Sequence, residues 1–274
     1  MSSRGQRDAQ ERGRRRRDRS GGAGVRRSFS TYADQSRRVI YVAAEGARTE
    51  RDYIDLLNTT YGEKTDPKFR LHFCHPGHNN GLRPEQVVDQ VLDVAGPDDE
   101  KWALFDRDKD DARDIEIPRA MRKAWQHGVQ VALSHPSFEL WLLLHFQQFT
   151  GQEDGLSETV LRRLRGHREA KGFEQYDVQS GDRGKGLGGQ RGQSLIGRER
   201  AAVRNASRLV ARCPYDGCSA EHADVTPIPA PRTESYEEWT RRTGHGPGCD
   251  PLKRDPSSDV WRLLAGLGIG TEER

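Results

Sequence analysis

The feature that most constrains this chain is a regular alternation of short apolar runs with longer amphipathic segments between residues 37 and 149. The apolar runs are residues 37–44, 69–75, 101–106 and 129–135. Segments with apolar residues at helical spacing follow them, at residues 49–58, 84–95, 117–127 and 137–149. Helical crossovers between short buried strands imply a parallel sheet covered on both faces. The sequence therefore predicts an α/β core over residues 37–150, with a parallel four-stranded sheet and flanking helices.

A different pattern follows residue 150. Residues 151–274 are expected to form a mainly helical extension, with helices at residues 156–165, 194–213 and 257–267. A glycine-rich basic loop, GDRGKGLGGQRG, spans residues 181–192. Residues 213–256 are rich in Pro and Gly, carry cysteine and histidine, and are expected to be irregular.

The N-terminal segment is strongly basic. Residues 1–27 hold ten arginines against three acidic residues, a formal charge of +7, so the +3 of the whole chain leaves −4 for the remainder. Because residues 1–36 lack the apolar side chains that offset ordering entropy, they are expected to be a disordered tail. This tail either contacts nucleic-acid phosphates or is a solvated segment without a role in the core activity.

The composition limits the class of protein. Hydrophobic residues make up 33% of the chain and no apolar run is long enough to span a bilayer, so no membrane partner is expected. Four cysteines in 274 residues do not suggest a disulfide framework. The start of the chain does not resemble a secretory signal. We expect a cytoplasmic protein.

Acidic residues stand where two of the apolar runs end. Glu45 follows the first run, and Asp106 and Asp108 follow the third, within WALFDRDKDD. Ligand sites of parallel sheets lie beyond the carboxyl ends of the strands, so the three carboxylates are expected on one rim. Carboxylates held close together favour a divalent cation such as Mg²⁺, or Mn²⁺ in its place. Asp106 and Asp108 would be its ligands, and Glu45 would be a third ligand. The alternative is a solvated acidic turn that caps the next helix.

Four stretches of the chain carry a family resemblance. They are VAAEGARTERDYI at residues 42–54, WALFDRDKDD at 102–111, SHPSFELWLLLHF at 134–146 and DPSSDVWRLLAGL at 255–267. An apolar strand ending in Glu-Gly, followed by a later strand ending in Asp-x-Asp, resembles the TOPRIM fold. The third stretch makes the chain similar to the RloB family, which includes the abortive-infection protein AbiLii.

This resemblance implies a function. It implies a TOPRIM-like, Mg²⁺-dependent site in which Glu45 is an acid/base carboxylate and Asp106 and Asp108 are metal ligands. It also implies a nuclease acting on DNA or RNA in bacterial anti-phage defence, by abortive infection or beside a restriction-modification system, with defence proteins as candidate partners. Two alternatives stay open: a non-catalytic module that binds nucleic acid or senses phage, and a nucleotidyl or phosphoryl transferase on a small nucleotide.

Further residues near the expected rim are candidates for the site. Glu50 lies one turn into the first helix, either as a metal ligand or as a favourable charge at a helix start. Glu139 lies in the first turn after the fourth strand and is expected to point into the site and assist catalysis. Arg48 either holds a phosphate or is solvent-exposed. His145 is expected to be a satisfied buried histidine.

The glycine-rich loop is a candidate nucleic-acid contact. It does not match the P-loop pattern, but Arg183, Lys185 and Arg191 can hold a phosphodiester backbone that the glycines allow to approach. The alternative is a flexible connector.

The irregular segment offers a candidate structural zinc site. Cys213, Cys218 and His222 lie close in sequence, and His245 and Cys249 follow later. We expect Cys213, Cys218, His222 and Cys249 as ligands, because zinc takes thiolate and imidazole donors in structural sites. The alternative is that these side chains never meet.

Overall fold

The computed structural model describes residues 37–75, 81–108, 112–149, 156–178, 184–226 and 234–271. The predicted disordered tail lies outside these residues. The described residues belong to one compact unit. In the described part of the chain, no helix is long and apolar enough to cross a membrane.

The sheet is mostly parallel, as predicted, but it has a fifth strand. Its order is β2-β1-β3-β4-β5. The strands are β1 (Arg37–Ala44), β2 (Lys68–Cys74), β3 (Glu100–Asp106), β4 (Val129–His135) and β5 (Ser257–Ser258). The first four are parallel, whereas β5 runs antiparallel to β4, with Ser258 opposite Ser134. The prediction of four strands was wrong because a two-residue strand has no periodicity to detect, and its residues were assigned to the helix that follows.

The helices largely fall where apolar spacing predicted them. They are α1 (Thr49–Tyr61), α2 (Pro84–Val94), α3 (Arg113–Gln126), α4 (Phe138–Leu144), α5 (Ser157–Gly166), α6 (Gln190–Leu195), α7 (Glu199–Val210), α8 (Tyr236–Arg241) and α9 (Val260–Gly266). The single helix expected over residues 194–213 is divided between α6 and α7, because Gly197 between them has a φ of +82°. The segment expected to be irregular contains α8, which begins with a capping box at Ser235.

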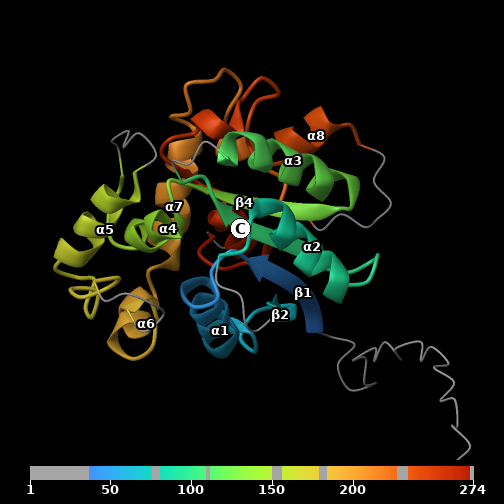
Figure 1. The fold of residues 1–274 in the computed structure, drawn as a ribbon. Helices are drawn as coiled ribbons and strands as arrows, with labels where there is room; N and C mark the ends of the chain where they lie inside the picture. Colours follow the sequence, from blue (N-terminus) through green and yellow to red (C-terminus); the bar gives the residue numbers. More distant parts are fainter. Residues whose placement is uncertain are drawn as a thin grey trace, which may run out of the picture. The chain divides into compact units, whose positions relative to one another are not determined.

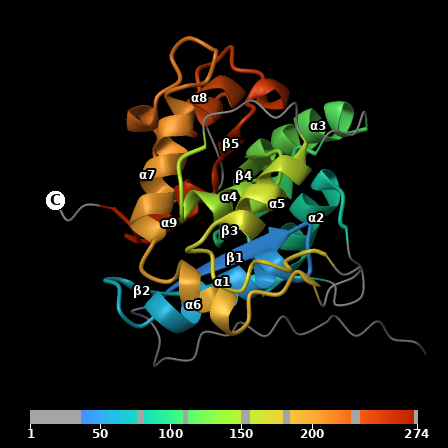
Figure 2. The same ribbon diagram turned by 90° about the vertical axis from the view of Figure 1, so that its left-hand side faces the viewer.

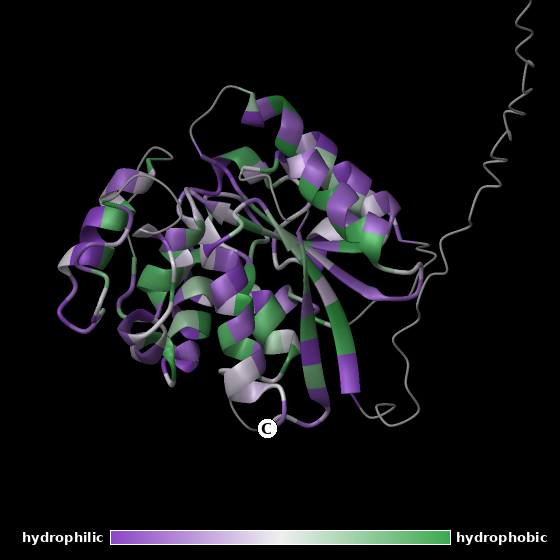
Figure 3. Cartoon of the chain, turned by 60° about the horizontal axis from the view of Figure 1, so that its bottom comes forward, coloured by the Kyte–Doolittle hydropathy of each residue, from purple (hydrophilic) through white to green (hydrophobic). Residues whose placement is uncertain are grey.

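Helices cover both faces of the sheet (Figures 1 and 2). Alternate residues of each strand point to opposite faces. Trp102 and Leu104 of β3 contribute to one hydrophobic cluster with α1, α4, α7 and α9. Ala103 and Phe105 contribute to the other, with α2 and α3. In Figure 3 the helices alternate hydrophobic and hydrophilic residues, as expected for helices packed against a sheet on one side.

One hydrophobic cluster joins the residues before and after position 150. Trp141 of α4, Val160 of α5, Leu209 of α7 and Leu263 of α9 all belong to it and are almost fully buried. Each such side chain contributes roughly 1.5–3 kcal/mol when removed from water. Helices α5, α7 and α9 therefore pack on the same side of the sheet as α1, whereas Trp239 of α8 belongs to the cluster on the other side.

Candidate functional site

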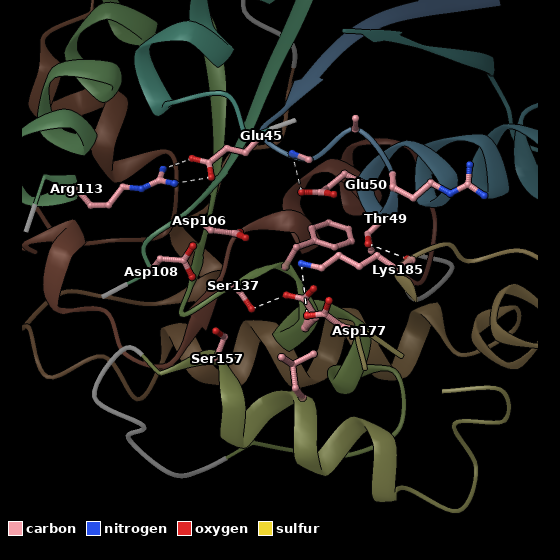
Figure 4. Close-up of a pocket in the computed structure, with 17 residues that line it drawn as sticks. Glu45, Thr49, Glu50, Asp106, Asp108, Arg113, Ser137, Ser157, Asp177 and Lys185 are labelled. Carbon is pink, nitrogen blue, oxygen red and sulfur yellow. Dashed lines mark hydrogen bonds and ion pairs between the residues drawn. The ribbon is translucent and has the colours of Figure 1, made fainter. Parts of the chain in front are cut away.

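A cavity of about 510 Å³ lies at the carboxyl ends of the parallel strands. Among the described residues, its acidic lining residues are Glu45, Glu50, Asp106, Asp108, Glu139 and Asp177. Its basic lining residues, again among those described, are Arg48, Arg113 and Lys185. The labelled carboxylates of Glu50, Asp106 and Asp108 point toward the same space in Figure 4. The cavity therefore gathers an excess of negative charge where such folds bind ligands.

Glu45 directly follows β1 and is held by an arginine. Its backbone N–H donates to the carbonyl of Leu104 at 3.2 Å, which fixes it beside β3. Both oxygens of its buried carboxylate accept from Arg113 of α3, with Nη2 to Oε2 at 2.9 Å. Burial raises the pKa of Glu45 to about 7, although Arg113 opposes the shift. A carboxyl group with such a pKa can accept and release a proton near neutral pH.

Asp106 ends β3 and lies among other carboxylates. Burial raises its pKa well above the usual range, and the charges of Glu45 and Asp108 add to the shift. Asp108 has a φ of +30°, a conformation that Asp tolerates better than most residues. Its N–H donates to the carbonyl of Pro136 at 3.0 Å. The turn after β3 is thus tied to the turn after β4, which brings both aspartates to the cavity.

Glu50 is buried in the first turn of α1. The N–H of Gly46 donates to its Oε1 at 3.2 Å. A Cβ on Gly46 would lie 2.3 Å from Oε2 of Glu50, so the glycine allows this close contact. Burial raises the pKa of Glu50 to about 7, and the charge of Glu139 adds to the shift.

Glu139 of α4 is buried and oriented by hydroxyl groups. Ser137 Oγ donates to its Oε2 at 2.6 Å, and Tyr176 Oη donates to its Oε1 at 3.0 Å. Tyr176 Oη also lies 2.7 Å from Thr49 Oγ1, which in turn donates to the carbonyl of Lys185 at 2.9 Å. These bonds connect α4, α1 and the glycine-rich loop on one side of the cavity.

The predicted phosphate-binding residues have different positions. Lys185 lines the cavity, with Nζ 3.5 Å from Asp177 Oδ2. Arg48 also lines the cavity, and its Nε lies 3.4 Å from Oδ2 of Asp52. Arg191 instead donates to the carbonyls of Gly172, Gly184 and Gly186 at 2.7–2.8 Å, which orders the loop. Arg183 lies outside the described residues.

The carboxylate set has the chemistry of a Mg²⁺ site, because hard cations prefer oxygen donors. Mg²⁺ usually takes one or two carboxylates and keeps several waters. Asp106 and Asp108 both line the cavity, whereas both oxygens of Glu45, the third predicted ligand, already bind Arg113. In the described part of the chain, one group of three or more ligand atoms lies within 4.8 Å of one another, and it contains no carboxylate.

That group contains Cys213, Cys218, His245 and Cys249. Three of the four expected zinc ligands are therefore brought together, but the histidine is His245. His222 is exposed and its Nδ1 lies 3.4 Å from the carbonyl of Gly217. His145 is buried, as expected. Its Nε2 lies 3.2 Å from Tyr53 Oη, and its Nδ1 lies 3.0 Å from the carbonyl oxygen of Trp141.

Three residues that hold the side chains or the loop of the cavity in place were not predicted from the sequence. Arg113, Thr49 and Tyr176 each hold a carboxylate or a loop in place. Arg113 follows the acidic turn in the sequence, but its contact with Glu45 is known only from the structure, in which Arg113 begins α3. Tyr176 belongs to no motif, so nothing in the sequence indicated that it lies beside Glu139.

The fold and the cavity define a class: a mostly parallel α/β protein with a carboxylate-lined site at the carboxyl ends of its strands. The family model described as RloB-like protein matches residues 40–264. The chain belongs to this RloB-like family. No match was found among curated proteins or among solved structures.

Proposed function

We propose that the chain is a metal-dependent, TOPRIM-type nuclease whose active site is the carboxylate-lined cavity. The observation that carries this proposal is the convergence of Asp106, Asp108, Glu45 and Glu139 on one cavity from β3, β1 and α4. Like charges in one partly buried space raise each other's pKa, and a divalent cation relieves that repulsion. The raised pKa of Asp106 is consistent with a site that is completed by a cation.

Asp106 and Asp108 would hold Mg²⁺ or Mn²⁺, which stabilises negative charge on a phosphate and activates water when bound. Glu45 would accept a proton from the attacking water. Arg113 orients Glu45, and a carboxylate has about four lone-pair sites, so two bonds from Arg113 leave room for a third. Ser137 and Tyr176 hold Glu139 toward the cavity, where it assists in positioning the substrate.

The substrate in this proposal is a nucleic acid, DNA or RNA. Among the described residues of the glycine-rich loop, Lys185 is the basic residue that lines the cavity, so it would contact the phosphate beside the scissile bond. Arg48 lies at the same cavity and would contact a neighbouring phosphate. The resemblance to RloB and AbiLii supports a role in anti-phage defence, with other defence proteins as partners.

The test is cleavage of labelled DNA and RNA with Mg²⁺ or Mn²⁺ by wild type, Asp106→Asn, Glu45→Gln and the control Asp98→Asn. Asp98 is an exposed residue outside the cavity. We expect metal-dependent cleavage in wild type and the control and its loss in the two cavity variants. Unchanged cleavage by Asp106→Asn would contradict the assigned site. Absence of cleavage by wild type on every substrate would contradict an autonomous nuclease.

The size of the cavity favours a second candidate function. About 510 Å³ lies in the range of small-molecule pockets, and Ser157 and Leu161 of α5 bound one side. A small nucleotide fits this volume, so the same carboxylates would then serve nucleotidyl or phosphoryl transfer. Turnover of a nucleoside triphosphate without strand scission, lost in Asp106→Asn, would favour this candidate over the nuclease.

A further inference from the structure

A compact group of sulfur and nitrogen atoms lies in the segment between α7 and β5. Three cysteine sulfurs and a ring nitrogen of His245 all lie within 4.8 Å of one another. They come from two stretches of sequence, residues 213–218 and 245–249. His245 and Cys249 are buried, and Cys213 and Cys218 are partly buried. The fold has therefore brought three thiol groups and one imidazole to one place with little exposure to water.

The distances within this group distinguish a metal site from a disulfide. Cys213 Sγ and Cys249 Sγ are 3.5 Å apart, and Cys249 Sγ is 3.5 Å from His245 Nδ1. A disulfide requires about 2.05 Å between its sulfurs. Zn–S bonds of about 2.3 Å in a tetrahedron place two sulfurs roughly 3.8 Å apart. The observed separations are close to those of two ligands on one zinc ion.

The groups around the cluster suit thiolates bound to a metal. The N–H of Gly246 donates to Cys218 Sγ at 3.2 Å, and Arg254 Nε donates to Cys249 Sγ at 3.3 Å. Donors of this kind stabilise the negative charge that thiolate ligands carry.

The orientation of His245 is also that of a metal ligand. Nδ1 faces the sulfurs, while Nε2 lies 3.4 Å from Oδ1 of the buried Asp259. A carboxylate behind a histidine fixes the ring and its tautomer in many zinc sites. Asp259 therefore has the position of the carboxylate that supports a zinc-bound histidine.

We propose that Cys213, Cys218, His245 and Cys249 form a closed, structural zinc site. Three thiolates and one imidazole are a donor set that selects zinc over Mg²⁺ or Ca²⁺. Four protein ligands leave no position for a substrate, so the role is structural. This site is separate from the proposed catalytic cavity, and its zinc content can be measured without a nucleic-acid substrate.

The zinc would anchor the edge of the sheet beside the catalytic cavity. Asp259, which supports His245, donates its N–H to the carbonyl of Leu133 at 2.9 Å. The preceding Ser258 pairs with Ser134 of β4, and Ser134 lies opposite Asp106 in β3. A continuous series of contacts thus leads from the metal ligands to the carboxyl end of β3.

The experiment measures metal in the full chain as purified without added zinc. We expect one zinc per chain by elemental analysis in wild type. Cys249→Ser and Cys218→Ser should each lose most of it. The matched controls Cys74→Ser and His222→Ala should keep it, because Cys74 is a buried thiol and His222 a nearby histidine, both outside the cluster.

A second measurement covers the case in which the cysteine variants fail to fold. Wild type loaded with Co²⁺ in place of zinc should show the sulfur-to-metal charge transfer and the visible bands of a tetrahedral thiolate site. Absence of these bands, zinc-free wild type with two of these cysteines in a disulfide, or loss of zinc in His222→Ala would each overturn the proposal.

Discussion

The cavity at the ends of the strands and the cysteine–histidine cluster both gather metal-ligating side chains, but they are built in opposite ways. In the cluster, four donor atoms lie within 4.8 Å of one another, and Asp259 and Arg254 support them from behind. In the cavity, the carboxylates are spread around about 510 Å³, and Glu45 is held by Arg113. Structural metal sites are closed by protein ligands, whereas catalytic sites keep an open position, and the two proposed sites differ in this way.

The largest expected effect comes from removing zinc from the cluster. The segment between α7 and β5 has few core residues, so the binding energy of a structural zinc becomes folding energy. Prolonged treatment with a strong chelator should lower the unfolding midpoint by roughly 10 °C or more, given about 2–4 °C per kcal/mol for a chain of this size. Calorimetry before and after chelation checks this. An unchanged midpoint after complete zinc removal would show that the cluster is not a structural metal site.

Substitution of a cavity carboxylate should reduce activity without reducing stability. Asp106→Asn should lower the cleavage rate by about 10²–10³-fold, comparable to the loss of one key electrostatic group in other enzymes. It should not lower the unfolding midpoint, because the amide removes a charge that burial and neighbouring carboxylates disfavour. Single-turnover rates and thermal unfolding of the same preparation test both parts. A large loss of stability would mean that Asp106 is a structural residue.

A buried histidine outside both regions provides a pH test. Burial lowers the pKa of His145 to about 4, whereas an unfolded histidine titrates near 6.5. Because the unfolded chain binds the extra proton first, stability should fall as pH decreases from about 6.5 to 4 and level off below that. The contribution amounts to about 3 kcal/mol at 1.36 kcal/mol per pH unit. Denaturant unfolding across this range should show a smaller pH dependence in His145→Gln, and equal dependence in the two proteins would contradict this account.

The smallest expected effect concerns phosphate binding at the cavity. Lys185→Gln should weaken nucleic-acid binding by about tenfold and reduce the slope of log K against log salt by about 1, the loss of one phosphate contact. Lys171→Gln is the matched control, because Lys171 is exposed and does not line the cavity. Binding measured by fluorescence anisotropy at several salt concentrations distinguishes the two. Equal slopes of log K against log salt in the two variants would show that Lys185 does not contact a phosphate.

The sequence predicted the frame of the cavity better than its details. The predicted bounds of β4 are those observed, because strand periodicity determines where the strand lies. Glu45, Asp106 and Asp108 were expected on one rim because parallel strands bring their carboxyl ends together, and all three line the cavity. The pairing of Glu45 with Arg113 was not predicted, since 68 residues separate them. Contacts of this range depend on how α3 packs on the sheet.

In the cysteine–histidine cluster, too, the sequence did not predict which residues meet. The prediction named His222, which is four residues from Cys218, but His245 lies equally close to Cys249, so spacing cannot choose between them. In the structure, His245 lies between Cys249 and the buried Asp259, whereas His222 is exposed. Strand β5 was missed because two residues carry no pattern. Local sequence thus identified the kinds of ligand, whereas tertiary packing selected among them.

The central claim is that the cavity carboxylates bind a divalent cation through Asp106 and Asp108. The most direct measurement is a titration of the zinc-loaded protein with Mn²⁺, in which electron paramagnetic resonance measures the concentration of unbound Mn²⁺. It compares wild type with Asp106→Asn and Asp98→Asn. We predict saturable Mn²⁺ binding in wild type and in Asp98→Asn, competition by Mg²⁺, and a large loss of affinity in Asp106→Asn. Equal Mn²⁺ binding in all three proteins, or no binding in wild type, would contradict the claim.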